Sequence, residues 1–154
     1  MEYGTIEREL HIAASPEVVF DVISRPEHIR DWWSAETGIE PVSGSTSDLT
    51  WRDESSGRVD AVPITVIDVR PHDLFSFRWT HAPGETPTSS NSLLVTFELT
   101  PTADGTVLRL TESGFRERGW EIAQLEEAYH DHVSGWDFYL PRIAEVAARQ
   151  VSPS

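Results

Sequence analysis

The residues from Thr5 to Ile12 alternate between apolar and polar side chains. Ile6, Leu10 and Ile12 fall on one face, whereas most of the intervening residues are charged or polar. A repeat of two residues is typical of a half-buried β-strand, in which successive side chains point to opposite faces. The segment is therefore predicted to be a strand, although Arg8 interrupts its apolar face.

Two short helices are predicted after this strand. Ser15 offers an N-cap hydroxyl and Pro16 suits the first helical position, so a helix is expected to begin here. Pro26 is expected to end it, because the residue before a proline is driven out of the helical conformation. A second short helix follows and ends at the pair Trp32 and Trp33.

Between Leu49 and Ser113 the pattern changes to short alternating runs separated by turn-forming residues. Phe75, Phe77 and Trp79, for example, share one face of their run. Such a series predicts an antiparallel meander with an aromatic face that another layer must cover.

Two interruptions of this meander are informative. Pro63 lies in the run from Val59 to Val69 and predicts an edge strand or a bulge, since proline donates no backbone hydrogen bond. The segment from His81 to Asn91 is rich in Pro, Gly, Ser and Thr, so it is predicted to be a loop. It is long enough to act as a lid over a cavity.

The cover is predicted to be one long amphipathic helix from Glu121 to about Arg149. Its inward positions recur at steps of three or four residues and are Leu125, Tyr129, His132, Val133, Trp136, Leu140, Ile143 and Ala147. Pro141 removes a hydrogen bond within the helix and is expected to kink it just after Trp136.

Together these elements predict an α+β helix-grip fold. A curved antiparallel β-sheet wraps around a long C-terminal α-helix, with two short helices after the first strand. A chain of 154 residues suits one domain with a core and a modest cavity. We predict a single domain over residues 1–150 and a disordered tail over residues 151–154.

Composition excludes several classes of function. The chain has 26 acidic and 12 basic residues, a formal net charge of −14, which argues against nucleic-acid and membrane partners. Every basic residue is arginine and cysteine is absent, so lysine Schiff-base chemistry, thiolate chemistry and disulfides are excluded. The six histidines lack the spacing of metal ligands, and no metal or cofactor is predicted. The sequence begins without a signal-like segment, so a cytoplasmic location is expected.

Several short segments resemble one known group of proteins. They are residues 70–71 (Arg-Pro), 75–79 (Phe-Ser-Phe-Arg-Trp), 104–106 (Asp-Gly-Thr), 111–115 (Thr-Glu-Ser-Gly-Phe) and 135–136 (Gly-Trp). With the order of elements, they resemble the START-like, birch-pollen-allergen-like superfamily, and within it the Hsp90 ATPase activator-like branch. The resemblance implies a helix-grip fold and a cavity that takes lipids, polyketides, plant hormones or drug-like aromatics. It also leaves open a chaperone-interacting role.

Aromatic and apolar residues of the sheet and the last helix are the candidates for contacting a ligand, by stacking and burial of area. The predicted ligand-binding residues are Trp33, Trp51, Phe77, Trp79, Phe97, Leu110, Glu112, Phe115, Tyr129, His132, Val133 and Trp136. The alternative is that these side chains simply pack the core.

Glu112 and His132 are the candidates for catalysis. Glu112 shares the inward face of Leu108 and Leu110, where an enclosed carboxyl could act as a general acid or base with His132. The alternative is a structural carboxylate satisfied by Arg78, Tyr129 or His132, or one exposed at the end of its strand.

Gly114 and Gly119 flank Phe115, and turn geometry explains them. The resemblance adds a sharper alternative, since some proteins of this branch in enediyne producers bind the antibiotic and sacrifice their own backbone. Gly114 and Gly119 are then candidates for the sacrificed residue, because glycine is a good hydrogen-atom donor.

We therefore predict non-catalytic binding of a hydrophobic, aromatic or polyketide-like small molecule between the sheet and the last helix. Three alternatives remain open: enediyne self-resistance by backbone cleavage, a polyketide cyclase, aromatase or hydrolase using Glu112 and His132, and a module that contacts a chaperone or another protein partner.

Overall fold

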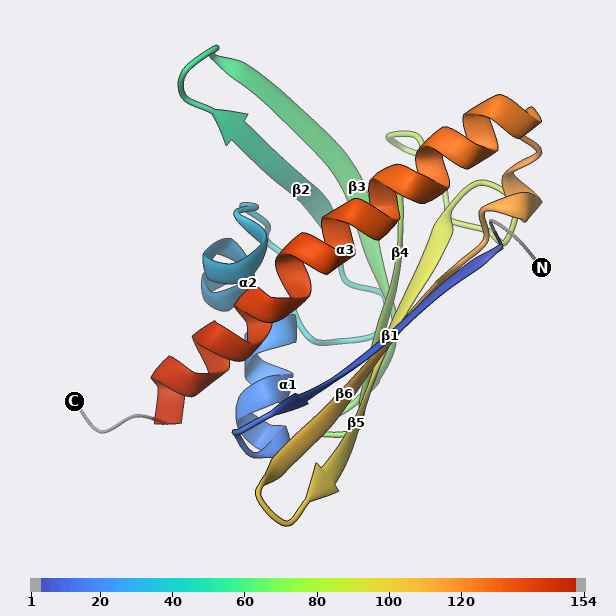
Figure 1. Cartoon of the computed structure of the whole chain (residues 1–154). Helices are drawn as coiled ribbons and strands as arrows, with labels where there is room; N and C mark the ends of the chain where they lie inside the picture. Colours follow the sequence, from blue (N-terminus) through green and yellow to red (C-terminus); the bar gives the residue numbers. More distant parts are fainter. Residues whose placement is uncertain (1–3, 152–154) are drawn as a thin grey trace.

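The computed structural model describes residues 4–151. Figure 1 shows a curved sheet crossed on one face by a long helix. The elements in chain order are β1 (Thr5–Ile12), α1 (Pro16–Ser24), α2 (Pro26–Trp33), β2 (Thr46–Asp53), β3 (Arg58–Arg70), β4 (Leu74–Trp79), β5 (Leu93–Thr102), β6 (Gly105–Ser113), the 3-10 helix η1 (Arg116–Arg118) and α3 (Ile122–Val151).

The six strands form one antiparallel sheet in the order β1-β6-β5-β4-β3-β2. Strands β2 to β6 are a meander, and β1 joins it beside β6, where Ile6 pairs with Glu112. On the other side of β6, Glu112 pairs with Val95. These findings confirm the predicted α+β helix-grip fold.

Both short helices lie where the sequence indicated, and α2 begins at Pro26 itself, the residue expected to end the first helix. The Ser15 hydroxyl accepts a 3.3 Å hydrogen bond from the backbone N–H of Val18 and caps α1, which starts at Pro16. Ser34, with a φ of 59°, ends α2 in the left-handed region. Trp33, the last residue of α2, is buried against the core.

Pro63 lies in β3, inside the sheet, because β2 is the edge strand. Strand β3 pairs with β4 only from Ile64 onward, and before that residue it pairs with β2 alone. The carbonyl of Pro63 accepts from Thr80 N, so its nitrogen also faces the β4 side rather than β2. The missing N–H therefore interrupts neither ladder, and the bulge in β3 comes later, between Val66 and Asp68.

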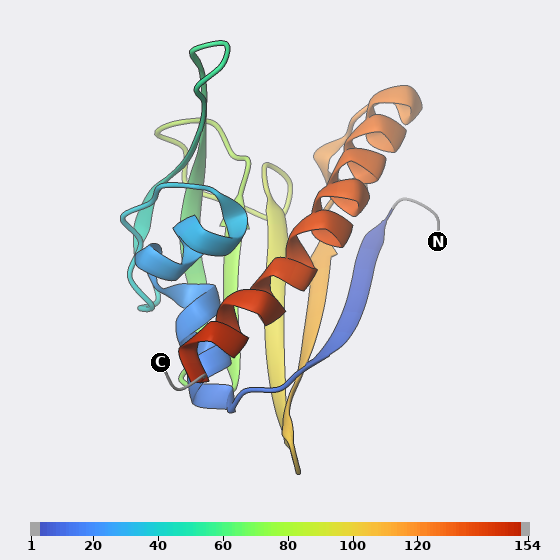
Figure 2. The ribbon, with the colours of Figure 1, turned by 60° about the vertical axis from the view of Figure 1, so that its left-hand side comes forward.

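Helix α3 covers the sheet and packs against α1 and α2 through its C-terminal half (Figure 2). Its buried residues are Leu125, Trp136, Leu140, Ile143, Val146 and Ala147. The helix continues through Pro141, which lies on its exposed side. It also includes Val151, the first residue of the predicted tail, and residues 152–154 lie outside the described residues.

Candidate functional site

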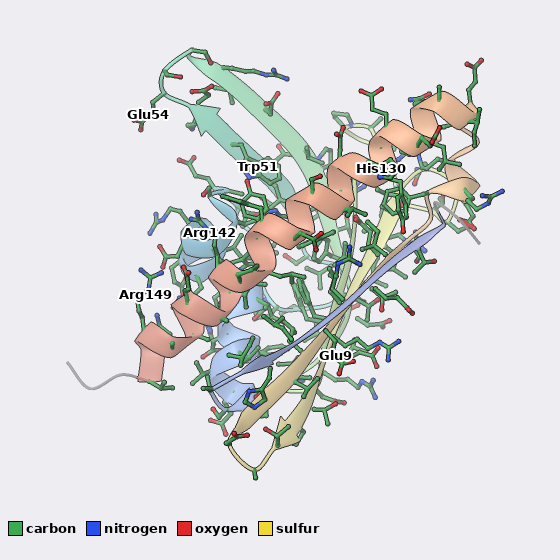
Figure 3. All side chains as sticks on the ribbon, viewed as in Figure 1. Glu9, Trp51, Glu54, His130, Arg142 and Arg149 are labelled. Atoms are coloured by element: carbon green, nitrogen blue, oxygen red, sulfur yellow. The ribbon has the colours of Figure 1, made fainter. Side chains whose placement is uncertain are left out.

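A pocket of about 480 Å³ opens where α3 faces the end of α2 and the strands β2, β3 and β4. Ligand pockets span roughly 300–1,000 Å³, so a drug-sized molecule fits this volume. Figure 3 shows Trp51 between the β2–β3 hairpin and α3. The lining residues are Trp33, Trp51, Val62, Trp79, Thr80, Asp131, His132, Gly135, Trp136 and Tyr139.

Trp33 is the centre of the aromatic wall. Its ring stacks on Trp32 at 5.0 Å between centroids and lies 5.1 Å from Trp79 and 5.4 Å from Trp136. Its backbone carbonyl accepts a 2.8 Å hydrogen bond from the indole N–H of Trp51. The end of α2 thus holds indoles from β2, β4 and α3 in one cluster.

Glu112, on β6, is completely buried beneath this wall. Its Oε2 accepts a 2.7 Å hydrogen bond from the indole N–H of Trp79. Its Oε1 lies 2.8 Å from the indole nitrogen of Trp136 and 2.9 Å from Nδ1 of His132. Burial of a carboxylate is unfavourable unless its oxygens are paired, and here both oxygens accept hydrogen bonds. The carboxylate therefore fixes three side chains of the pocket wall.

His132 is the polar side chain that links Glu112 to the pocket. Nδ1 points inward to the carboxylate, and the ring lies 5.3 Å from Trp79 and 5.4 Å from Phe115. About 20% of the side chain is exposed. Within residues 4–151 the other nitrogen, Nε2, has no hydrogen-bond partner and is not sealed from solvent. The imidazole, which belongs to the pocket lining, thus keeps one nitrogen without a hydrogen-bond partner among the described residues.

Gly135 contributes empty space to the pocket. It lies inside α3, and a Cβ built there would meet no atom within 4 Å. Its φ is ordinary, so neither backbone conformation nor packing requires glycine at this position. A glycine in a helix interior is unfavourable by about 0.5–1 kcal/mol relative to alanine. The residue is explained by the room it leaves beside the indoles.

The structure brings five of the predicted binding residues to the pocket lining, namely Trp33, Trp51, Trp79, His132 and Trp136. Glu112 lies directly behind them. The others lie outside the lining and fill the space between the sheet and α3 or pack at its margin; these are Phe77, Phe97, Leu110, Phe115, Tyr129 and Val133. The interior is thus closed by aromatic packing, and the open volume lies at its rim.

Of the partners considered for Glu112, only His132 contacts it. The Tyr129 hydroxyl donates instead to the backbone carbonyl of Thr5, at 3.0 Å. Arg78 donates to the carbonyl of Thr88, at 3.2 Å. Two of the carboxylate's three partners are indoles, which the sequence pattern did not point to.

Gly114 and Gly119 do not line the aromatic pocket. Both have positive φ, 106° and 75°, which explains glycine at these turns. Gly114 borders a different hollow, of about 640 Å³, which is surrounded mainly by charged and polar residues such as Arg78 and Glu117. That hollow is larger but lacks an aromatic wall.

The loop from His81 to Asn91 is tied down at both ends by one side chain. Arg118 donates from Nη1 to the carbonyl and the hydroxyl of Thr80 and, at 2.7 Å, to the carbonyl of Asn91. Thr80 itself lines the pocket. Burial lowers the pKa of His81, which packs in this loop near Arg118. The predicted loop therefore begins next to the site, but none of residues 81–91 belongs to the pocket lining.

Five lining residues were missed from the sequence: Val62, Thr80, Asp131, Gly135 and Tyr139. Tyr139 could have been found, because it follows Trp136 by three residues on the same helix face. Val62 and Thr80 reach the site because β3 extends past the end of β4. No local sequence pattern reveals this offset between the two strands.

Within residues 4–151, no group of three or more His, Cys, Asp or Glu side chains is placed to hold a metal ion. No helix in the same range is both long and apolar enough to cross a membrane.

The fold and the pocket together define a helix-grip domain with an aromatic site at one rim of the sheet. The family model described as "Activator of Hsp90 ATPase homolog 1-like protein" matches residues 13–148. The chain therefore belongs to this family, as the sequence resemblance indicated. No curated protein matches the chain.

Several solved structures share the fold. Protein MLL2253 of Mesorhizobium loti is 25% identical, with a TM-score of 0.73 over 94% of this chain and 97% of that one. The Aha1 dimer of Colwellia psychrerythraea is 20% identical, with a TM-score of 0.68 over 93% and 95%. DynU16, a protein of the dynemicin biosynthetic locus, is 21% identical, with a TM-score of 0.66 over 92% of this chain and 46% of its own.

Proposed function

We propose that this protein binds a hydrophobic, aromatic small molecule in the pocket between α3 and the indoles of α2, β2 and β4, without transforming it. The observation that carries this proposal is the lining itself, in which four tryptophans and Tyr139 surround about 480 Å³. Aromatic side chains bind flat apolar ligands by area burial and by offset or edge-to-face ring contacts.

The hydrogen bonds of Glu112 support this proposal. They hold Trp79, Trp136 and His132 in place from behind. A wall that is ordered before the ligand arrives loses little conformational entropy on binding, which favours affinity. A buried carboxylate with three N–H partners is thus explained as a support for the binding surface.

Gly135 supports the proposal independently. Glycine has a low helix propensity, yet it occurs in α3 at the position that borders the pocket. No neighbouring atom is close enough to exclude a side chain there. The absent side chain keeps the volume open. Because a Cβ there meets nothing within 4 Å, a side chain introduced at this position starts in open space rather than against the core.

The test is a titration of the protein with naphthalene, followed by tryptophan fluorescence and by the unfolding temperature. A ligand at 100 times its Kd should stabilise the fold by about 2.7 kcal/mol. Gly135→Leu fills the pocket from the helix and should abolish binding while the protein stays folded. Ser134→Leu, at an exposed neighbouring position outside the lining, is the matched control and should bind normally.

Either of two results would refute the proposal. The first is that naphthalene and larger aromatic probes all leave the fluorescence and the unfolding temperature unchanged. The second is that Gly135→Leu and Ser134→Leu bind naphthalene equally well. The second result would place any bound aromatic somewhere other than this pocket.

The Glu112–His132 pair supports a second candidate function, a cyclase, aromatase or hydrolase. Since Glu112 is sealed from the pocket, only His132 could touch a substrate, and Glu112 would orient its ring. This candidate requires turnover that is lost in His132→Phe while binding is retained, whereas the binding proposal requires no turnover.

Antibiotic self-resistance remains an alternative of the binding proposal. The glycine that borders the pocket is Gly135 rather than Gly114 or Gly119. Peptide mapping after exposure to an enediyne and a thiol would test it, with scission beside Gly135 as the expected product.

A further inference from the structure

His132 offers the pocket a hydrogen-bond acceptor of defined position. Its Nδ1 lies 2.9 Å from a carboxylate oxygen, and a carboxylate accepts, so the ring proton belongs on Nδ1. In its neutral form the imidazole then carries its lone pair on Nε2. That atom has no partner within residues 4–151, and His132 lines the pocket.

The charged groups around the site disfavour an anionic ligand. Asp131 is exposed and lines the pocket next to His132, and the whole chain carries a formal charge of −14. An anionic ligand is repelled by both. The indole N–H groups of Trp79 and Trp136 are already donated to Glu112, so these two walls offer a ligand only their apolar surface.

We infer that the ligand is a neutral aromatic molecule with a hydroxyl group, and that this hydroxyl donates its hydrogen bond to Nε2 of His132. This inference rests on the proposed function and names the chemical class that the same pocket selects. Glu112 is the positioning residue, since its bond to Nδ1 sets both the tautomer and the direction of the ring. The rings of the ligand lie against Trp33, Trp79 and Trp136.

Three probes of similar size separate the hydroxyl from the aromatic rings. 2-Naphthol can donate a hydrogen bond, 2-methoxynaphthalene cannot, and 2-naphthoate is anionic. The wild-type protein should bind 2-naphthol about tenfold more tightly than 2-methoxynaphthalene, the net worth of about one hydrogen bond. It should bind 2-naphthoate the most weakly of the three.

Two variants connect this selectivity to His132. His132→Phe keeps an aromatic ring in the wall and removes Nε2, so 2-naphthol and 2-methoxynaphthalene should bind with equal affinity. His130→Phe makes the same change at an exposed position of α3 outside the pocket and should preserve the tenfold preference. Isothermal titration calorimetry at neutral pH measures all nine combinations.

The outcomes separate this inference from the proposed function. If wild-type protein binds all three probes without preference, or prefers 2-naphthoate, the inference is overturned and the aromatic pocket stands. If the preference survives in His132→Phe, another group recognises the hydroxyl and the inference is overturned. If wild-type protein binds none of the probes, the proposed function fails and takes the inference with it.

Discussion

Oε1 of Glu112 lies 2.8 Å from the indole nitrogen of Trp136, so an acidic side chain of the last strand holds the last helix from within the core. Glu112 has no exposed surface. The bond is one of three that the carboxylate accepts, and it joins β6 to α3 at the floor of the aromatic pocket. The same carboxylate therefore serves both the packing of the fold and the shape of the site.

Replacement of Glu112 by Gln should destabilise the protein by about 1–3 kcal/mol, the penalty for an unsatisfied buried polar group. The amide nitrogen cannot accept, so the N–H of either Trp79 or Trp136 loses its partner. Urea unfolding monitored by tryptophan fluorescence measures the change. Glu98→Gln, the same substitution at an exposed position of β5, should leave stability within about 0.5 kcal/mol of wild type. Equal stability of both variants would mean that the carboxylate does not support the wall.

Gly135→Ala should raise the free energy of unfolding by up to about 1 kcal/mol and weaken the binding of aromatic ligands. Alanine favours the helix, and its methyl group enters the pocket without a clash. Gly119→Ala provides the contrast: its φ of 75° makes alanine strained, so that variant should be less stable. Chemical denaturation and ligand titration of both variants measure these effects. A Gly135→Ala protein that is destabilised would contradict the structural explanation of this glycine.

Stability should fall as the pH is lowered from 7.5 to 5.5, in part because of His81. Burial lowers the pKa of His81 below its ordinary value of 6.5. The negative charge of Glu85 raises this pKa by a smaller amount, and the positive charge of Arg118 lowers it further. The unfolded chain therefore takes up a proton near pH 6.5 that the folded protein resists, so stability is greatest above this pH and declines below it. The urea midpoint should drop less in His81→Phe than in wild type. An equal drop of the urea midpoint in both proteins would show that His81 does not contribute to the pH dependence.

Loss of Arg118 should free the loop from His81 to Asn91. Its guanidinium holds the two ends of the loop through Thr80 and Asn91, and methionine would keep the length of the side chain without the hydrogen bonds. Hydrogen exchange in this loop should be faster in Arg118→Met than in wild type, whereas exchange in β5 and β6 should be unchanged. Arg149→Met, at an exposed residue in the last turn of α3, is the control for the lost charge. Unchanged exchange in Arg118→Met would show that the loop is ordered by other contacts.

Most of the fold could be predicted from local signals. The alternation of Phe75, Phe77 and Trp79 indicated a strand with an aromatic face, and all three are buried in β4. Ser15 and Pro16 indicated the start of α1, and the cap is present. These signals are reliable because capping and side-chain periodicity depend on residues within a few positions of one another.

The site was predicted less completely, because its parts come from elements that are distant in the sequence. The parity of Glu112 with Leu108 and Leu110 indicated that it points inward, and it does. Its partners Trp79 and Trp136 could not be deduced, since strand pairing and the rotation of α3 bring them there. Likewise, the sequence indicated an aromatic cavity between sheet and helix, whereas the packing of Phe77, Phe97 and Phe115 closes the interior and leaves the pocket at the rim.

By itself, the sequence determined the elements, the antiparallel meander, the covering helix and the class of residue that a ligand would meet. Only the tertiary structure decided that the carboxylate of Glu112 accepts hydrogen bonds from two indoles and an imidazole. It also decided that one nitrogen of His132 has no partner among the residues that the structure describes and that Gly135 leaves space in the pocket. The physical reason is the sequence separation between the residues that interact. Hydrophobic periodicity and capping act over a few residues, whereas hydrogen bonds between side chains and the shape of a cavity depend on how whole elements pack against one another.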